Sequence, residues 1–180
     1  MKTIYVSCMM GALWLIAACV PTDPQNGNGL DGGNTADAEV KLDVAPKTTL
    51  VPVTRPALDN FLLEQRYLDF AGESGLHQSE GPHFGRVRTF MNPILVASLQ
   101  AGNMEHPQGA AAVKELYKGG QTLLGWAVMV KIGPRSGAGD GWYFFEADGN
   151  RAFADGTAEP VCAQCHESGN DFILSAFPLR

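Results

Sequence analysis

The alternation of apolar and polar stretches divides the chain into three parts. Residues 1–18 have a basic start and an apolar run from Ile4 to Ala18, a pattern typical of an export signal and too short for a membrane span. Residues 19–45 are rich in Pro, Asn, Gly and Asp, as expected for a flexible polar tether. Residues 46–180 carry periodic apolar patterns and predict one domain of ordinary size.

Two longer helices are predicted in this domain, and a third, short helix is expected to begin at Cys162. The apolar spacing that begins at Leu58 follows i, i+3, i+4 and predicts an amphipathic helix over 57–70. Asn92 followed by Pro93 predicts the N-cap and first residue of a second helix, which ends near Ala101.

Strands are predicted where apolar runs are rich in aromatic or β-branched residues. The segments with this character are 85–91, 110–117, 123–132 and 141–146. Glycine-bearing residues predict loops at 72–82 and 133–140, the second of them a hairpin between two strands. The middle of the domain is therefore expected to be β-rich.

The candidate chemistry lies near the C-terminus, where the chain reads Cys162-Ala163-Gln164-Cys165-His166. Two thiols at this spacing can each add to one vinyl group of the same porphyrin, and the adjacent histidine can bind the iron as its proximal ligand. A redox dithiol or half of a zinc site is the alternative, but no second cysteine pair follows. The motif predicts one covalently attached haem c on Cys162, Cys165 and His166.

The N-terminal region indicates an exported protein, in agreement with the haem motif. Ile16-Ala17-Ala18-Cys19 resembles a bacterial lipobox, in which Cys19 becomes the lipidated first residue; an ordinary residue at the end of a signal is the alternative. Haem attachment is also a reaction of exported proteins. We therefore expect a lipid-anchored protein of the bacterial cell envelope that faces the periplasm. The outer membrane is expected because Val20, rather than Asp, follows the cysteine, as in outer-membrane lipoproteins.

Cysteine use and charge narrow the remaining options. With Cys8 in the signal, Cys19 lipidated and the other two cysteines holding haem, no thiol is left for a disulfide. The chain has a net charge of −6, which argues against nucleic acid and anionic lipid headgroups as partners.

The position of the haem motif separates classes of cytochrome. Small electron-carrier cytochromes c have the motif near the N-terminus and a ligating methionine downstream, but no methionine follows His166. Four-helix cytochromes c′ end in the motif, but their long helices do not fit the predicted strands. A β-rich domain with a C-terminal haem motif is what this sequence indicates.

Three segments carry a resemblance to a known family. Gly109 to Leu116 reads G-x-x-x-V-K-E-L, Asp171 to Phe177 reads D-x-x-x-x-x-F after the haem motif, and Arg86 to Pro93 ends in Asn-Pro. These segments resemble the cytochrome P-460 family, with the c′-beta cytochromes as relatives. The resemblance implies an α+β fold, mainly antiparallel β-sheet with flanking helices, one haem with an open distal side, and a homodimer.

The resemblance also implies two functions. Hydroxylamine-oxidising members bond a lysine of the V-K-E-L segment to the porphyrin, which is Lys114 here, and pass electrons to another cytochrome. The c′-beta relatives instead bind nitric oxide or carbon monoxide in an apolar pocket. A plain electron shuttle is disfavoured, since that role prefers six-coordinate iron.

Catalytic candidates follow from both arguments. On a strand, Lys114 shares a face with Ala112 and Leu116 and must snorkel, pair or react; the alternative is a solvated lysine beside Glu115. Glu159, just before the haem motif, is the candidate carboxylate proton acceptor, and an exposed loop glutamate is its alternative reading.

A sixth iron ligand is not expected. The candidate histidines lie in polar or loop-like stretches and are predicted at the surface; they are His77, His83 and His106.

Overall fold

A computed structural model describes residues 49–83, 85–134, 137–149 and 151–180. All of them belong to one compact unit, Val44–Arg180. The predicted signal (1–18), the predicted lipidation site Cys19 and the predicted polar tether (19–45) lie outside the described residues. In the part of the chain that is described, no helix is long and apolar enough to cross a membrane.

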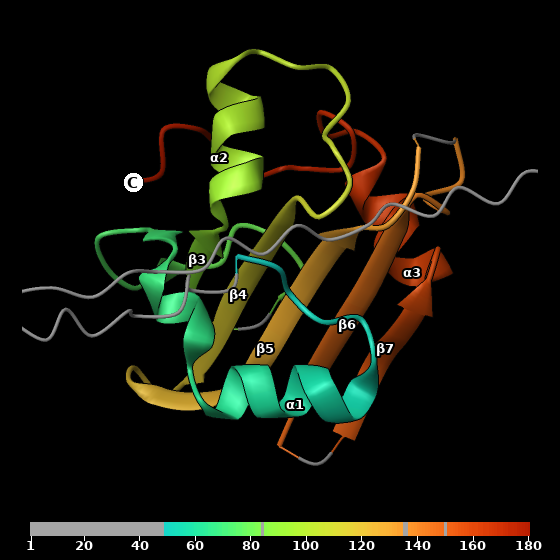
Figure 1. The fold of residues 1–180 in the computed structure, drawn as a ribbon. Helices are drawn as coiled ribbons and strands as arrows, with labels where there is room; N and C mark the ends of the chain where they lie inside the picture. Colours follow the sequence, from blue (N-terminus) through green and yellow to red (C-terminus); the bar gives the residue numbers. More distant parts are fainter. Residues whose placement is uncertain (1–48, 84, 135–136, 150) are drawn as a thin grey trace, which may run out of the picture. The chain divides into compact units, whose positions relative to one another are not determined.

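The fold is α+β, with a mainly antiparallel sheet of seven strands and three α-helices (Figure 1). The strand order is β1-β3-β4-β5-β6-β7, and β2 pairs with β3. The elements are α1 (Arg55–Leu63), the 3-10 helix η1 (Arg66–Asp69), β1 (Ala71–Gly72), β2 (His77–Gln78), β3 (Arg86–Met91), α2 (Pro93–Gln100), β4 (Ala111–Lys118), β5 (Thr122–Lys131), β6 (Trp142–Asp148), β7 (Arg151–Thr157) and α3 (Pro160–His166).

The first predicted helix was too long. Helix α1 ends at Leu63, because Gln65 adopts a left-handed conformation with a φ of 54° and the chain continues as η1. The apolar spacing still identified the buried side of α1, where Phe61 and Leu62 are buried. Leu68, in contrast, is 46% exposed.

The second predicted helix is confirmed in α2. The side chain of Asn92 accepts a hydrogen bond from the Leu95 N–H at 3.0 Å, and Pro93 is the first helical residue. Asn92 also bonds to the Ala111 N–H and the Gly109 carbonyl. This asparagine therefore fixes α2 to the start of β4.

The four predicted strands are confirmed as β3, β4, β5 and β6. The prediction missed β7, which is an edge strand with mostly exposed residues. It also missed β1 and β2, whose two residues each are too short for a periodic signal. The haem motif does not open a helix but ends one, since α3 begins at Pro160 and ends at His166.

The two faces of the sheet have different coverings. Helix α1 crosses one face, as Figure 1 shows, and packs with η1 on a core that includes Val113, Val128 and Phe145. The opposite face is covered at one end by a second core. Its members come from α2, the sheet, α3 and the C-terminal segment, and include Leu95, Met129, Trp142, Ala163 and Phe172.

A buried carboxylate adds hydrogen bonds on the sheet face that α1 covers. Glu115 is 4% exposed and accepts hydrogen bonds from the hydroxyls of Tyr67, at 2.7 Å, and Tyr117, at 2.9 Å. The indole N–H of Trp126 donates to Tyr67 at 2.9 Å. These hydrogen bonds satisfy the polar atoms of Glu115 inside an apolar layer.

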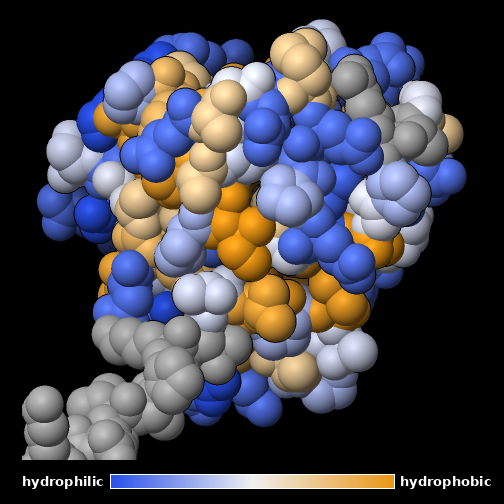
Figure 2. All heavy atoms as spheres, turned by 45° about the horizontal axis from the view of Figure 1, so that its top comes forward, coloured by the Kyte–Doolittle hydropathy of each residue, from blue (hydrophilic) through white to orange (hydrophobic). Residues whose placement is uncertain are grey.

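Apolar side chains on the surface are scattered on the face drawn in Figure 2, where orange patches alternate with polar residues.

Candidate functional site

Part of the sheet face opposite α1 is left uncovered. Residues that are paired across neighbouring strands form the floor of this uncovered part. One row reads Thr89, Lys114, Ala127, Glu146 and Ala154 across β3 to β7. Neighbouring strands lie about 4.8 Å apart, so the backbones of Lys114 and Glu146 are roughly 10 Å apart. The methyl group of Ala127 between them leaves an open recess.

This recess is a cavity of about 530 Å³. Its walls are the sheet, the loop after β2, α3 and the C-terminal segment. The reactive or ligating side chains that line it include Lys114, Glu146, His83, Cys162, Cys165 and His166. A smaller hollow of about 40 Å³ adjoins it and is also lined by Lys114, Glu146, His83 and His166.

One nitrogen of His166 is fixed and the other is left for a ligand. Nδ1 lies 2.8 Å from the carbonyl oxygen of Phe172, which makes Nδ1 the protonated nitrogen. Burial lowers the pKa of His166, while this hydrogen bond opposes the shift. A neutral imidazole whose Nδ1–H is held by a carbonyl has the form of a metal-ligating histidine.

The segment that supplies the Phe172 carbonyl is anchored by a buried ion pair. Nζ of Lys131 lies 2.7 and 2.9 Å from the two carboxylate oxygens of Asp171. The backbone N–H of His106 also donates a hydrogen bond to Asp171 at 2.8 Å. Asp171 and Phe172 both have positive φ, 44° and 70°. These bonds therefore hold a strained turn in the position where its carbonyl meets His166.

The two cysteines line the cavity as free thiols, Cys162 half-buried and Cys165 exposed. Burial, with the nearby carboxylates of Glu146 and Glu159, raises the pKa of Cys162 to about 11. A redox dithiol needs a readily formed thiolate, so this environment disfavours the dithiol alternative.

Lys114 lies on the cavity side of β4, opposite to its neighbour Glu115. Burial lowers the pKa of Lys114, and the carboxylates of Glu73 and Glu146 partly offset that shift. Its amine forms no hydrogen bond or ion pair with the described residues. A partly desolvated amine of this kind is nucleophilic whenever it is neutral.

The structure does not bring Glu159 into the cavity. Its carboxylate turns toward β7, where Oε1 lies 3.4 Å from the Asp155 N–H, and it is absent from the cavity lining. Glu146 lies there instead. Sequence reasoning missed Glu146, although alternation in β6 places it on one face with Trp142 and Phe144.

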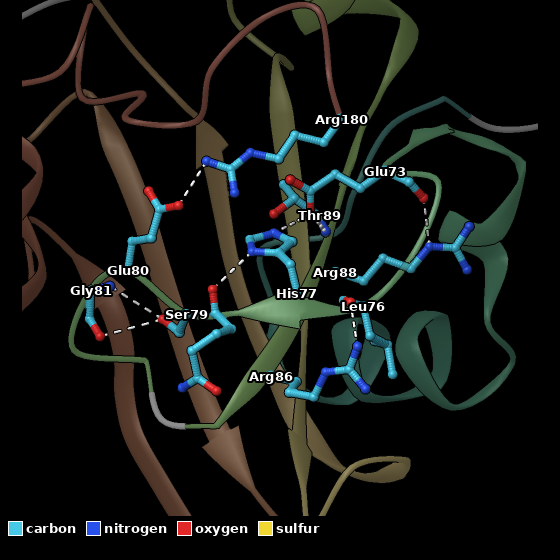
Figure 3. A network of polar contacts seen from close by, with 11 residues as sticks. Glu73, Leu76, His77, Ser79, Glu80, Gly81, Arg86, Arg88, Thr89 and Arg180 are labelled. Atoms are coloured by element: carbon cyan, nitrogen blue, oxygen red, sulfur yellow. Dashed lines mark hydrogen bonds and ion pairs between the residues drawn. The ribbon is translucent and has the colours of Figure 1, made fainter.

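A polar network forms one rim of the cavity (Figure 3). Oε2 of buried Glu73 lies 3.0 Å from His77 Nε2 and accepts the Thr89 N–H at 2.6 Å. Arg180 reaches Glu80 at 2.8 Å in an exposed pair. These contacts attach the β2 region and the chain end to the cavity rim.

Two of the three candidate histidines, His83 and His106, differ from the expectation of surface positions. His106 is buried, at 2% exposure, and bonds to Ser98 at 2.9 Å. The side chain of His83 is only 15% exposed and lines the cavity. Loop-like sequence did not reveal that these loops fold back over the sheet.

No protein-family model matches the chain, and no curated protein matches it. The resemblance to the cytochrome P-460 family therefore stays a prediction that depends on the motifs and on the site geometry.

Proposed function

We propose that this protein is a cytochrome of the P-460 type that holds one covalent haem c in the cavity and oxidises hydroxylamine or a similar small nitrogen compound. The supporting observation is that Cys162, Cys165, His166 and Lys114, from two distant segments, line one cavity. Electrons would pass to a partner cytochrome.

The cavity fits a porphyrin in size and polarity. Its volume of about 530 Å³ lies in the range of cofactor sites. Several of the exposed large apolar side chains lie on its lining, where a porphyrin would cover them; these are Leu124, Phe153, Val161 and Leu174. Nε2 of His166, which bonds to no described residue, would be available to bind the haem iron.

The residues of the cavity have distinct roles in this proposal. A haem bound here would supply an iron that accepts electrons from the substrate. Oxidation of an N–H or O–H group also releases protons, and the Glu146 carboxylate is placed to accept them. Lys114 supplies an amine beside the porphyrin.

A bond from Lys114 to the porphyrin would retune the iron. Joining Nζ to a meso carbon replaces one N–H bond and one C–H bond with a C–N bond and releases two protons and two electrons, so a two-electron oxidant is needed. Hydrogen peroxide is such an oxidant and is reduced to water. The modified macrocycle would have altered iron electronics.

Binding of nitric oxide or carbon monoxide without turnover is the alternative function. The observation that favours it is the small apolar floor formed by Ala112 and Ala127 beside Lys114. Such a floor suits a diatomic gas.

The setting proposed for this activity is the bacterial envelope. Lipid on Cys19 would hold the domain at the outer membrane, facing the periplasm, where redox partners are found. A homodimer is part of the same proposal.

The test is production of the protein in a host that attaches haem c. We expect a covalent haem that survives acid–acetone extraction and gives a c-type pyridine haemochrome, and we expect oxidation of hydroxylamine with an artificial electron acceptor. The double variant Cys162→Ala/Cys165→Ala should lose the covalent haem. Freely extracted haem in the unaltered protein would contradict the proposal, and covalent haem with gas binding but no turnover would favour the alternative.

A further inference from the structure

Two imidazoles that are distant in the sequence lie close together at the cavity. The ring centroids of His83 and His166 are 6.3 Å apart, and their planes make an angle of 64°. His83 belongs to the loop between β2 and β3, whereas His166 ends α3. Both line the main cavity and the adjoining hollow.

Each ring directs Nδ1 toward a protein oxygen. Nδ1 of His166 is 2.8 Å from the Phe172 carbonyl. Nδ1 of His83 is 3.0 Å from Oε2 of Glu146, close enough for an ion pair but not in hydrogen-bond alignment. No bond from either Nε2 to a described residue is formed. A carbonyl acceptor at Nδ1, as His166 has, is typical of histidines that bind metal through the other nitrogen. The Glu146 carboxylate lies near Nδ1 of His83 without such a bond.

The spacing of the rings suits one iron between them. A metal–imidazole bond is about 2 Å long and the ring centre lies roughly 1 Å behind the nitrogen, so two trans imidazoles have centroids about 6 Å apart. The observed 6.3 Å agrees with this arrangement. The two rings of a trans pair can adopt any relative rotation about the axis, so the 64° angle is compatible.

We infer that His83 is the second axial ligand of the iron in the resting protein, opposite His166, and that a small molecule must displace it to bind. This inference rests on the proposed haem. It replaces the expectation from sequence that His83 is a surface residue and that the sixth position is open.

The loop that carries His83 is held in a way that permits displacement. Its ion pair between Glu80 and Arg180 has side chains 73% and 55% exposed, and such pairs add little stability. The Ser79 N–H donates to the Gly85 carbonyl at 3.0 Å across the loop, and this local bond can persist when the loop moves as a unit. Among the described residues, these two contacts of the loop are exposed or local. Competition of His83 with the small molecule would weaken the apparent affinity.

The experiment compares His83→Gln with the matched variant His77→Gln. His77 also lines the cavity, but its Nδ1 and Nε2 lie 2.9 and 3.0 Å from Gln78 O and Glu73. We expect a low-spin six-coordinate absorption spectrum and electron paramagnetic resonance signal for the unaltered holoprotein and for His77→Gln. His83→Gln should become high-spin, with the same haem content by pyridine haemochrome and an unchanged circular dichroism spectrum.

Carbon monoxide gives a second measurement on the reduced proteins. Its observed binding rate should level off with concentration in the unaltered protein, because release of His83 limits it, and should rise linearly and at least tenfold faster in His83→Gln. A covalent haem that is high-spin in the unaltered protein, or a His83→Gln variant that stays low-spin, would overturn the ligand assignment alone. Loss of covalent haem from the unaltered protein would instead contradict the proposed function.

Discussion

The carboxylate of Asp171 and the amine of Lys131 form an ion pair with side chains that are 0% and 1% exposed. The pair joins the end of β5 to the turn after the Cys-x-x-Cys-His motif. The same turn presents the Phe172 carbonyl to Nδ1 of His166. A bond between two residues outside the cavity lining thus helps to fix the orientation of the predicted iron ligand.

Replacing Lys131 with methionine should strongly destabilise the fold. The variant leaves a buried carboxylate without its counter-charge, and loss of one member of a buried pair typically costs about 3–5 kcal/mol. Urea unfolding followed by circular dichroism measures the change. The double variant Lys131→Met/Asp171→Asn should recover part of the loss, since it buries no unpaired charge; equal stability of the single variant and the original protein would contradict the assigned role.

Acid should weaken the protein through Asp171. Burial alone would raise its pKa, but hydrogen bonds from Lys131 and from the His106 N–H hold the pKa below the ordinary value of 3.8. A lowered pKa contributes stability that is complete above the ordinary value and is lost as pH falls through the folded-state value. The stability difference between the original protein and Asp171→Asn should therefore shrink below about pH 4. A difference that stays constant down to pH 2 would exclude this linkage.

Glu146 and Glu159 should differ in their effect on turnover. Glu146→Gln removes the cavity carboxylate and should lower the rate of hydroxylamine oxidation by about 10²-fold or more at unchanged haem content, the usual range for a lost general base. Glu159→Gln should have a much smaller effect, because that carboxylate points to β7. Steady-state rates with a fixed electron acceptor test both variants, and the reverse order of effects would restore Glu159 as the proton acceptor.

Lys114 should form a cross-link to the porphyrin. Tryptic mass spectrometry is expected to join the Lys114 peptide to the haem peptide of Cys162 and Cys165, before or after exposure to peroxide. Lys114→Arg keeps the charge but should give separate peptides and an unshifted absorption spectrum. Separate peptides in the original protein after peroxide, with nitric oxide binding intact, would favour the gas-binding function.

Sequence reasoning was most successful where a segment has a clear local pattern, such as the alternation of residues along a strand. Alternation along β4 correctly separated Lys114 from Glu115, because each strand residue faces opposite to the next. Asn92 and Pro93 fixed the start of α2 through a local hydrogen bond. Both features depend on a few neighbouring residues, so they can be read from the chain.

The missed features depend on contacts between distant segments. Gln65 ends the first helix in a left-handed conformation that its residue type does not favour. Glu146 and His83 belong to the site only because β6 and the loop after β2 meet over the same recess. In the sequence, Lys131 is only a lysine at the end of an apolar run, and its ion-pair partner lies 40 residues away.

The hydrogen bond from Tyr67 to Glu115 has a consequence for the opposite side of the sheet. Shifting β4 by one residue would turn the Glu115 carboxylate into the recess and direct the Lys114 ammonium among Tyr67 and Phe90. The shift would break the Tyr67 hydrogen bond, which comes from outside β4, and bury an unmatched charge. Tyr67 thus helps to fix the register of β4, and a packing defect on its side of the sheet would remove the Lys114 amine from the cavity on the other side.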